Sequence, residues 1–190
     1  VQRFQAVSAP EIVLDAIYLY TSFAENGTAL SILRLELPAE TERKLHLKPI
    51  QGAEIWSLNV NGQVRSLFSH QSGDWVIPLD EGKSVVELAY LQKGQKLGLK
   101  GRLDVTVPAT GLAARKLNVA IALADRVELI AMEGELEPTR GKDWPAVQGF
   151  AGKPYFFSHP FYRGDDLKAA IYYQEPLEQS PIESSKENNS

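Results

Sequence analysis

Apolar and polar residues alternate with a period of two along most of the chain, from about residue 15 onward. In AIYLYTSF (16–23), Ile17, Leu19, Thr21 and Phe23 fall on one face. Successive side chains of a strand point to opposite faces, so this pattern is typical of half-buried strands. Similar runs, each closed by turn residues, lie at 29–37, 44–50, 55–68, 74–79, 84–91, 102–108, 116–123, 126–138, 155–162 and 167–174. Helical periodicity is almost absent.

The segment IWSLNVNGQVRSLF (55–68) has the clearest hairpin pattern, because Asn61-Gly62 joins two alternating arms. A two-residue turn of this type needs positive φ at both central positions, which Gly adopts freely and Asn tolerates. We therefore expect Val60 to pair with Gln63. This stretch is strong evidence for strands and almost none for an activity.

About eleven or twelve short strands separated by turns indicate an all-β fold, and we expect an antiparallel β-sandwich, immunoglobulin-like or related. RLELPAETERKLHL (34–47) weakly resembles RLDVTVPATGLAARKLNV (102–119), which would fit two packed sandwiches meeting near residues 98–101. A chain of 190 residues suits either one substantial core or two small ones. We favour one continuous β-sandwich region over residues 15–175.

The two ends and one internal segment depart from the alternating pattern. Residues 1–14 are expected to be an N-terminal extension or a leading strand around EIVL (11–14). Residues 176–190 contain almost no apolar side chains, so we expect a disordered tail or linker. The Gly- and Pro-rich segment 137–154 predicts a long surface loop. Since the chain begins with Val1 and has no signal-peptide pattern, we expect a piece of a longer protein.

Composition excludes several classes of function. The chain has no cysteine, which rules out disulfides, thiolate metal sites and thiol nucleophiles. The net charge is −4 and no Lys/Arg block is long enough to track phosphates, so nucleic acid is not an expected partner. No apolar run approaches the roughly 20 residues of a membrane span. We expect no cofactor.

The polar residues form no pattern typical of catalysis. The histidines lie on separate expected strands or loops: His46, His70 and His159. The segment SHQSGD (69–74) holds Ser, His and Asp, but a hydrolytic triad is assembled from separate loops. Asp80–Gly82 and Asp165-Asp166 are expected to be solvated turns rather than calcium sites. Arg163–Asp165 is expected to be a turn between two strands. The sequence therefore predicts no catalytic and no metal-binding residue.

Aromatic side chains are the best candidates for contact with a ligand or a partner. Four of them lie in the Gly- and Pro-rich segment or after it: Trp144, Tyr155, Phe161 and Tyr162. Exposed aromatic rings stack on sugars and anchor protein interfaces. Trp144 is expected to be the leading contact residue. Trp56 shares a face with Leu58 and Val60 in the alternating pattern, so it is expected to be buried.

Several segments together resemble a known kind of protein region. LPAETERKLHLKPIQGAEIWSLNVNGQVRSL (37–67), DWVIPL (74–79) and SVVELAY (84–90) are similar to a region of large, uncharacterised bacterial envelope-type proteins. GRLDVTVPATGLAARKLNVAIAL (101–123) looks like the next part of that region. The resemblance implies an extracytoplasmic β-sandwich, in the periplasm or cell envelope, of unknown function. It carries over no catalytic residue.

The sequence thus favours a non-catalytic β-sandwich module of a larger bacterial envelope protein. We expect it to act in structural or protein–protein contact, with a protein partner or the rest of its own polypeptide. The alternative is a carbohydrate-binding module that uses exposed aromatic side chains to hold a glycan. A hydrolase is a remote alternative, and it would need Ser, His and an acid within hydrogen-bond reach of one another.

Overall fold

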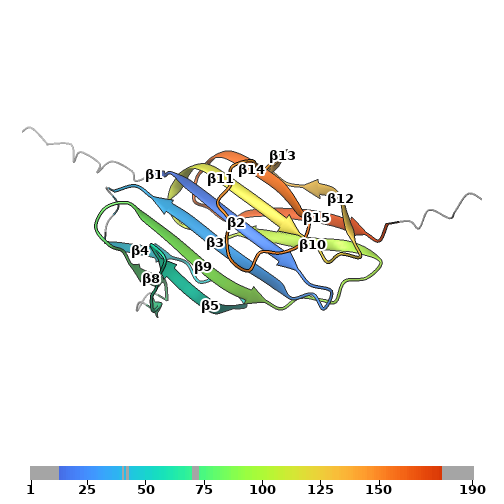
Figure 1. Cartoon of the computed structure of the whole chain (residues 1–190), viewed down its shortest axis with the longest axis horizontal. Coiled ribbons are helices and arrows are strands. Elements are labelled where there is room, and N and C mark those ends of the chain that lie inside the picture. Colours follow the sequence, from blue (N-terminus) through green and yellow to red (C-terminus); the bar gives the residue numbers. More distant parts are fainter. Residues whose placement is uncertain (1–12, 40, 42, 70–72, 177–190) are drawn as a thin grey trace, which may run out of the picture.

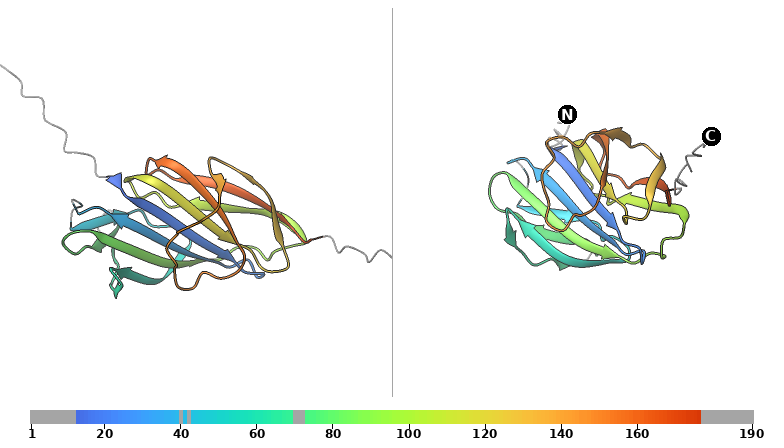
Figure 2. Two further views of the ribbon diagram at one scale, coloured as in Figure 1. Left: turned by 45° about the horizontal axis from the view of Figure 1, so that its top comes forward. Right: turned by 45° about the vertical axis from the view of Figure 1, so that its right-hand side comes forward.

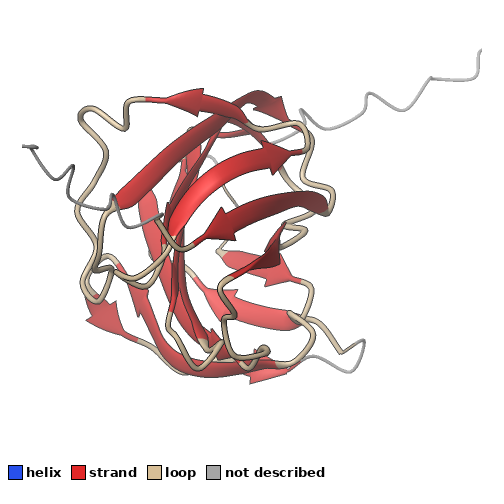
Figure 3. Ribbon diagram, turned by 90° about the vertical axis from the view of Figure 1, so that its right-hand side faces the viewer, coloured by secondary structure: helices blue, strands red, loops and turns tan. Residues whose placement is uncertain are grey.

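The computed structural model describes residues 13–39, 41, 43–69 and 73–176. These residues form fifteen strands and no helix (Figure 3), which confirms the all-β prediction. Within them, no helix is long and apolar enough to span a membrane. His70, most of residues 1–14 and most of residues 176–190 lie outside the described part of the chain.

A large mixed sheet forms one layer of the molecule (Figure 1), in the order β13-β14-β11-β2-β3-β9-β5-β6, with β1 also paired to β11. Its strands are β1 (Val13–Leu14), β2 (Ala16–Phe23), β3 (Ala29–Leu37), β5 (Ala53–Val60), β6 (Gln63–Val64), β9 (Ser84–Gln92), β11 (Ala113–Ala122), β13 (Glu137–Thr139) and β14 (Pro154–Tyr162). β11 is parallel to both β1 and β2. The sheet is therefore not purely antiparallel, because the long connection from β2 to β11 allows the parallel pairing.

Two small sheets form the second layer (Figure 2). One has the order β4-β8-β7, with β4 (Lys44–Leu47), β8 (Trp75–Pro78) and β7 (Phe68–Ser69). The other has the order β10-β15-β12, with β10 (Lys100–Val107), β15 (Leu167–Gln174) and β12 (Glu128–Glu133). Leu33 of the large sheet, Ile77 of the first small sheet and Ile171 of the second belong to one fully buried cluster. The core thus lies between the large sheet and both small ones.

The predicted inward faces are confirmed on the first strands. Ile17, Leu19, Thr21 and Phe23 of β2 are all buried.

Strands from both sides of residues 98–101 share the large sheet, since β11 pairs with β2. One apolar cluster therefore joins the two halves of the chain.

The Asn61-Gly62 turn has the expected geometry. Asn61 has φ 52° and Gly62 has φ 78°, and Val60 pairs with Gln63. β6 ends after two residues, and the chain then moves to the small sheet at β7. The hairpin is thus much shorter than the alternating sequence suggests.

The expectation that Trp56 is buried is wrong, because its side chain is 63 % exposed. Ile55 and Ser57 pair with consecutive residues of β9, which leaves Trp56 as an extra residue in a β-bulge. A bulge changes the phase of side-chain alternation along the strand. Ile55 before it and Leu58 after it therefore both contact the core, while Trp56 points away from it.

Candidate contact site on the outer face of the large sheet

A strap loop (residues 140–153) connects β13 to β14 and passes across the outer face of the large sheet (Figure 1). Its apolar side chains Trp144, Val147 and Phe150 pack on a small cluster formed by β2, β3 and β11. This cluster contains Tyr20, Ile32 and Ala120, all buried. The loop is thus at the surface, as predicted, but it forms a second, smaller core of its own.

Edge-to-face contacts with other aromatic rings fix the position of the Trp144 side chain of the strap loop against the sheet. Its ring lies 4.9 Å from that of Phe156 and 5.9 Å from that of Tyr18, both at steep interplanar angles. Edge-to-face packing at these distances is favourable because the ring edge is positive and the ring face negative. Trp144 is therefore half-buried in the protein and does not form an open aromatic platform.

A hydrogen bond ties the strap loop to the sheet. The Tyr20 hydroxyl donates to the backbone oxygen of Pro145 at 2.6 Å. Tyr20 also packs against Phe150 at 5.3 Å. Burial, followed by the nearby Tyr18 hydroxyl, raises the pKa of Tyr20 well above its usual value. The neutral hydroxyl is thus the form that the folded protein stabilises.

An ion-pair network lies beside the strap loop. Arg34 on β3 contacts Glu87 of β9 at 2.8 Å and Glu36 of its own strand at 3.2 Å. Burial alone would lower the pKa of Arg34, but its bonds to Glu87 and Glu36 outweigh this effect and raise it. All three side chains are about three-quarters buried, and they form a fixed polar boundary on this face.

Next to this network, the outer face is hollowed into a groove of about 320 Å³ that Glu87 and residues 147–149 of the strap loop both line. Trp56 lines it, together with the polar side chains Ser57, Asn59, Glu87 and Gln148 and the apolar side chains of Leu30, Ile32, Ala89 and Val147. An exposed indole ring beside a carboxylate, an amide and a hydroxyl can hold either a sugar ring or an apolar side chain of a protein. We define the Trp56 groove by these lining residues.

The four aromatic residues predicted as contacts do not converge on one site. Tyr155 is half-buried, and its hydroxyl accepts a hydrogen bond from the Leu129 backbone N–H at 3.2 Å. Tyr162 is only 4 % exposed, and its hydroxyl donates to the backbone oxygen of Asp165. Phe161 is 79 % exposed and has a positive φ of 54°. Sequence reasoning missed Trp56 because nothing in the residue pattern reveals a bulge.

Phe161 and Tyr162 line a separate hollow of about 570 Å³ at the turn between β14 and β15. His159 lies in the same hollow, with Nε2 3.5 Å from a carboxylate oxygen of Glu135. Asp166 helps to close the turn, since its carboxylate accepts the Ala109 N–H at 3.2 Å. The hollow is lined mainly by charged and polar side chains.

Two carboxylates that were considered as calcium ligands, those of Asp80 and Asp166, accept hydrogen bonds from other groups of the protein. Asp80 accepts hydrogen bonds from Arg65 at 2.9 Å and from Asn61 at 3.3 Å, which links the hairpin turn to the segment after β8. Across the described residues, no three His, Asp or Glu side chains are grouped so that they could hold a metal ion.

No protein-family model and no curated protein sequence matches the chain. Several solved structures match the chain in fold. Leukotriene A4 hydrolase from Saccharomyces cerevisiae superposes with a TM-score of 0.54 at 9 % identity, over 90 % of this chain and 32 % of that one. An M1 zinc metallopeptidase from Deinococcus radiodurans gives 0.51 at 9 % identity, over 87 % of this chain and 43 % of that one.

The part of these enzymes that the chain resembles is their non-catalytic β-domain. At 9 % identity the likeness concerns the fold alone. The chain spans 32 % of the length of the first enzyme and 43 % of the length of the second. The fold is thus one that is known as a part of larger proteins.

Proposed function

We propose that the chain is a non-catalytic β-domain of a larger bacterial envelope protein, in which it makes protein contacts. The observation that carries this proposal is the structural match with the β-domain of M1-type enzymes. The match covers nearly all of this chain but less than half of each enzyme. In this proposed role the domain holds its neighbours in place. The partner is then another domain of the same polypeptide or a separate protein.

The proposed location in the periplasm or envelope rests on the resemblance of residues 37–67 and 84–90 to segments of envelope-type proteins. The proposal assigns no catalytic residue to this chain.

Cell fractionation tests the proposal in the source organism. An antibody raised against residues 13–176 should detect a band well above 21 kDa in the envelope or periplasmic fraction. Purified chain incubated with Zn²⁺ and amino-acid anilides should show no hydrolysis. A free band of 21 kDa in the cytoplasmic fraction, or zinc-dependent turnover by the purified chain, would contradict the proposal.

Glycan binding is the second candidate, and one observation favours it. Trp56 is 63 % exposed beside the polar side chains of Asn59, Glu87 and Gln148. Oligosaccharides of glucose, xylose and N-acetylglucosamine should change the Trp fluorescence of the native chain and leave Trp56→Ala unchanged. If none of them alters the fluorescence of the native chain, the Trp56 groove is not a glycan site.

A further inference from the structure

The open edges of the three sheets differ in length and regularity. Most terminal strands are short: β13 has three residues, including Pro138, β6 and β7 have two each, and β4 has four. β12 is interrupted by a bulge between Leu129 and Ala131. Natural proteins use short strands, prolines and bulges to prevent other chains from pairing with an edge.

β10 has neither a proline nor a bulge, and of the protective features of edge strands it carries only charged side chains, Lys100, Arg102 and Asp104. It pairs with β15 over eight consecutive residues without a register shift, and its sequence KGRLDVTV contains no proline. Because it is the terminal strand of its sheet, its other side pairs with no strand of the described chain. β10 is thus the longest regular terminal strand in the described structure.

Hydrogen-bond alternation shows which groups of β10 face the open side. The Glu175 N–H donates to the Leu99 oxygen at 2.7 Å, which marks Leu99 as a residue bonded to the β15 side. In an antiparallel pair, bonded and non-bonded residues alternate. The backbone N–H and C=O groups of Arg102, Asp104 and Thr106 therefore point toward the open edge.

A hollow of about 550 Å³ adjoins this edge. Its other wall consists of Phe23 and Ala29 on the large sheet and of the connection from 92 to 96. Pockets of roughly 300–1,000 Å³ accommodate small ligands, and a neighbouring strand needs a spacing of about 4.8 Å. The hollow thus provides room beside β10 for an extended peptide.

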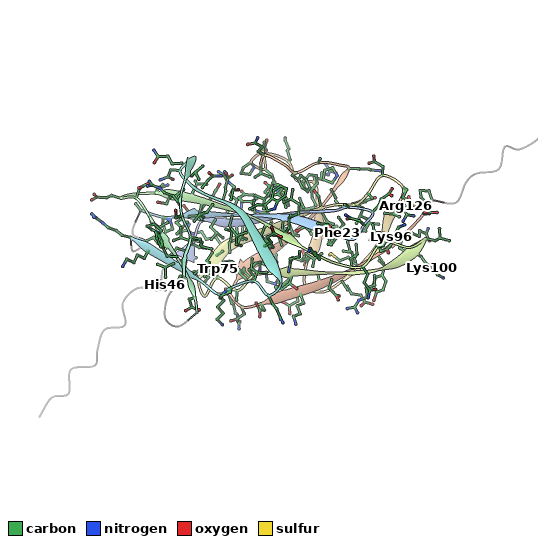
Figure 4. The ribbon with its side chains drawn as sticks, turned by 90° about the horizontal axis from the view of Figure 1, so that it is seen from below. Phe23, His46, Trp75, Lys96, Lys100 and Arg126 are labelled. Atoms are coloured by element: carbon green, nitrogen blue, oxygen red, sulfur yellow. The ribbon has the colours of Figure 1, made fainter. Side chains whose placement is uncertain are left out.

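The rim of the hollow is basic although the chain as a whole has a net charge of −4. Its lining includes Lys93, Lys96, Lys100 and Arg102 but only one acid, Asp104. Arg102 pairs with Asp104 at 2.9 Å, and no salt bridge between described residues involves the three lysines. Figure 4 shows Lys96 and Lys100 at the same end of the molecule as Phe23.

We propose that the open edge of β10 binds an extended acidic peptide segment of a partner protein as a fourth strand of the small sheet. The peptide backbone would bond to Arg102, Asp104 and Thr106, its carboxylates would face the lysines, and its apolar side chains would face Phe23. A second copy of β10 fits less well, because it would bring basic rims together. This inference specifies the partner in the proposed role in protein contact. It rests on that role and does not depend on the envelope location.

Peptide titration tests the charge and the extended conformation. Fluorescein-labelled Glu-Val-Glu-Thr-Glu-Val-Glu should bind the native chain in an anisotropy assay. The same peptide with lysines in place of the glutamates should bind at least about tenfold more weakly. Replacing its central Thr with Pro, which removes a backbone donor, should weaken binding as well.

Variants of the chain test the site itself. Thr106→Pro removes an N–H on the open side and should abolish peptide binding, whereas Thr106→Ala should bind like the native chain. The pair Lys96→Glu and Lys100→Glu should weaken binding by about tenfold or more. Lys44→Glu with Lys116→Glu, both at exposed positions on other sheets, is the matched control. Circular dichroism should confirm that each variant is folded.

Three results would overturn the inference: equal binding of the acidic and lysine peptides, native binding by the charge-reversed pair Lys96→Glu and Lys100→Glu, or a dimer in analytical ultracentrifugation that Thr106→Pro dissociates. None of them bears on the size and location of the parent protein. Failure here is therefore distinguishable from failure of the envelope-domain proposal, which fractionation tests.

Discussion

The outer face of the large sheet has two halves that differ in what covers them. On one half the strap loop covers Tyr20, which is only 3 % exposed. On the other half Trp56 is 63 % exposed, and residues 147–149 of the strap loop line the same groove as Trp56 without covering its ring. Tyr20 lies on a regular strand, whereas Trp56 is the extra residue of the bulge in β5. A neighbouring loop and a bulge, rather than residue type, thus decide which aromatic side chain is open to a partner.

Trp144→Ala should cause the largest loss of stability, because it removes the ring of the strap loop that packs against Tyr18, Tyr20 and Phe156. Loss of a half-buried indole should lower the free energy of unfolding by about 2 to 3 kcal/mol. Urea denaturation followed by circular dichroism measures it. A loss below about 0.5 kcal/mol would mean that the covered half is not stabilised by Trp144.

Tyr20→Phe sharpens the comparison by removing only the hydrogen bond to Pro145. The expected loss is about 1 kcal/mol, typical for one buried hydrogen bond. The folded pKa of Tyr20 lies above the unfolded value of 10.0, so its contribution is fully present below pH 10 and declines as the pH rises further. The stability difference between native chain and variant should therefore shrink above pH 10. A constant difference would contradict the assigned burial.

Glu87→Gln removes one of the two carboxylates that pair with Arg34 in the ion-pair network beside the strap loop. Since Arg34 keeps Glu36 as a partner, the free energy of unfolding should fall by only about 0.5 to 1 kcal/mol. The loss should be smaller in 1 M salt, where the pair is screened. Glu81→Gln is the matched control, because the Arg43–Glu81 pair is largely exposed and should contribute almost nothing. Equal losses in the two variants would remove the distinction.

Trp56→Ala should have the smallest effect on stability, within about 0.5 kcal/mol, because the side chain is mostly exposed. Acrylamide should quench the fluorescence of Trp56 more efficiently than that of Trp144. The comparison of Trp56→Ala with native chain isolates this component. A large loss of stability would mean that Trp56 is covered in solution.

Local structure was predictable from the sequence because alternation is a local property. The segments 16–23 and 29–37 coincide with β2 and β3, and the Asn61-Gly62 turn pairs as expected. The partners of each strand were not predictable, since residue patterns do not say which strands meet. β7 thus joins a small sheet, and β11 lies parallel to β2.

The candidate site was harder to predict than the fold. Trp144 was correctly placed in a surface loop, but the sequence could not reveal that Tyr18 and Tyr20 lie beneath it. Trp56 was misplaced because a single inserted residue reverses the alternation. The β10 edge could not be recognised either, because an edge is defined by the absence of a neighbour.

The parallel pairing of β2 with β11 sets an order on folding during synthesis. Ile17 pairs with Leu117, so β2 lacks its neighbour on that side until about a hundred further residues have left the ribosome. Pairing over such a sequence separation is slow, and unpaired strands are open to aggregation in the meantime. A nascent chain that ends before residue 113 therefore presents a central strand with one side unpaired, and chaperone demand should be highest over this interval.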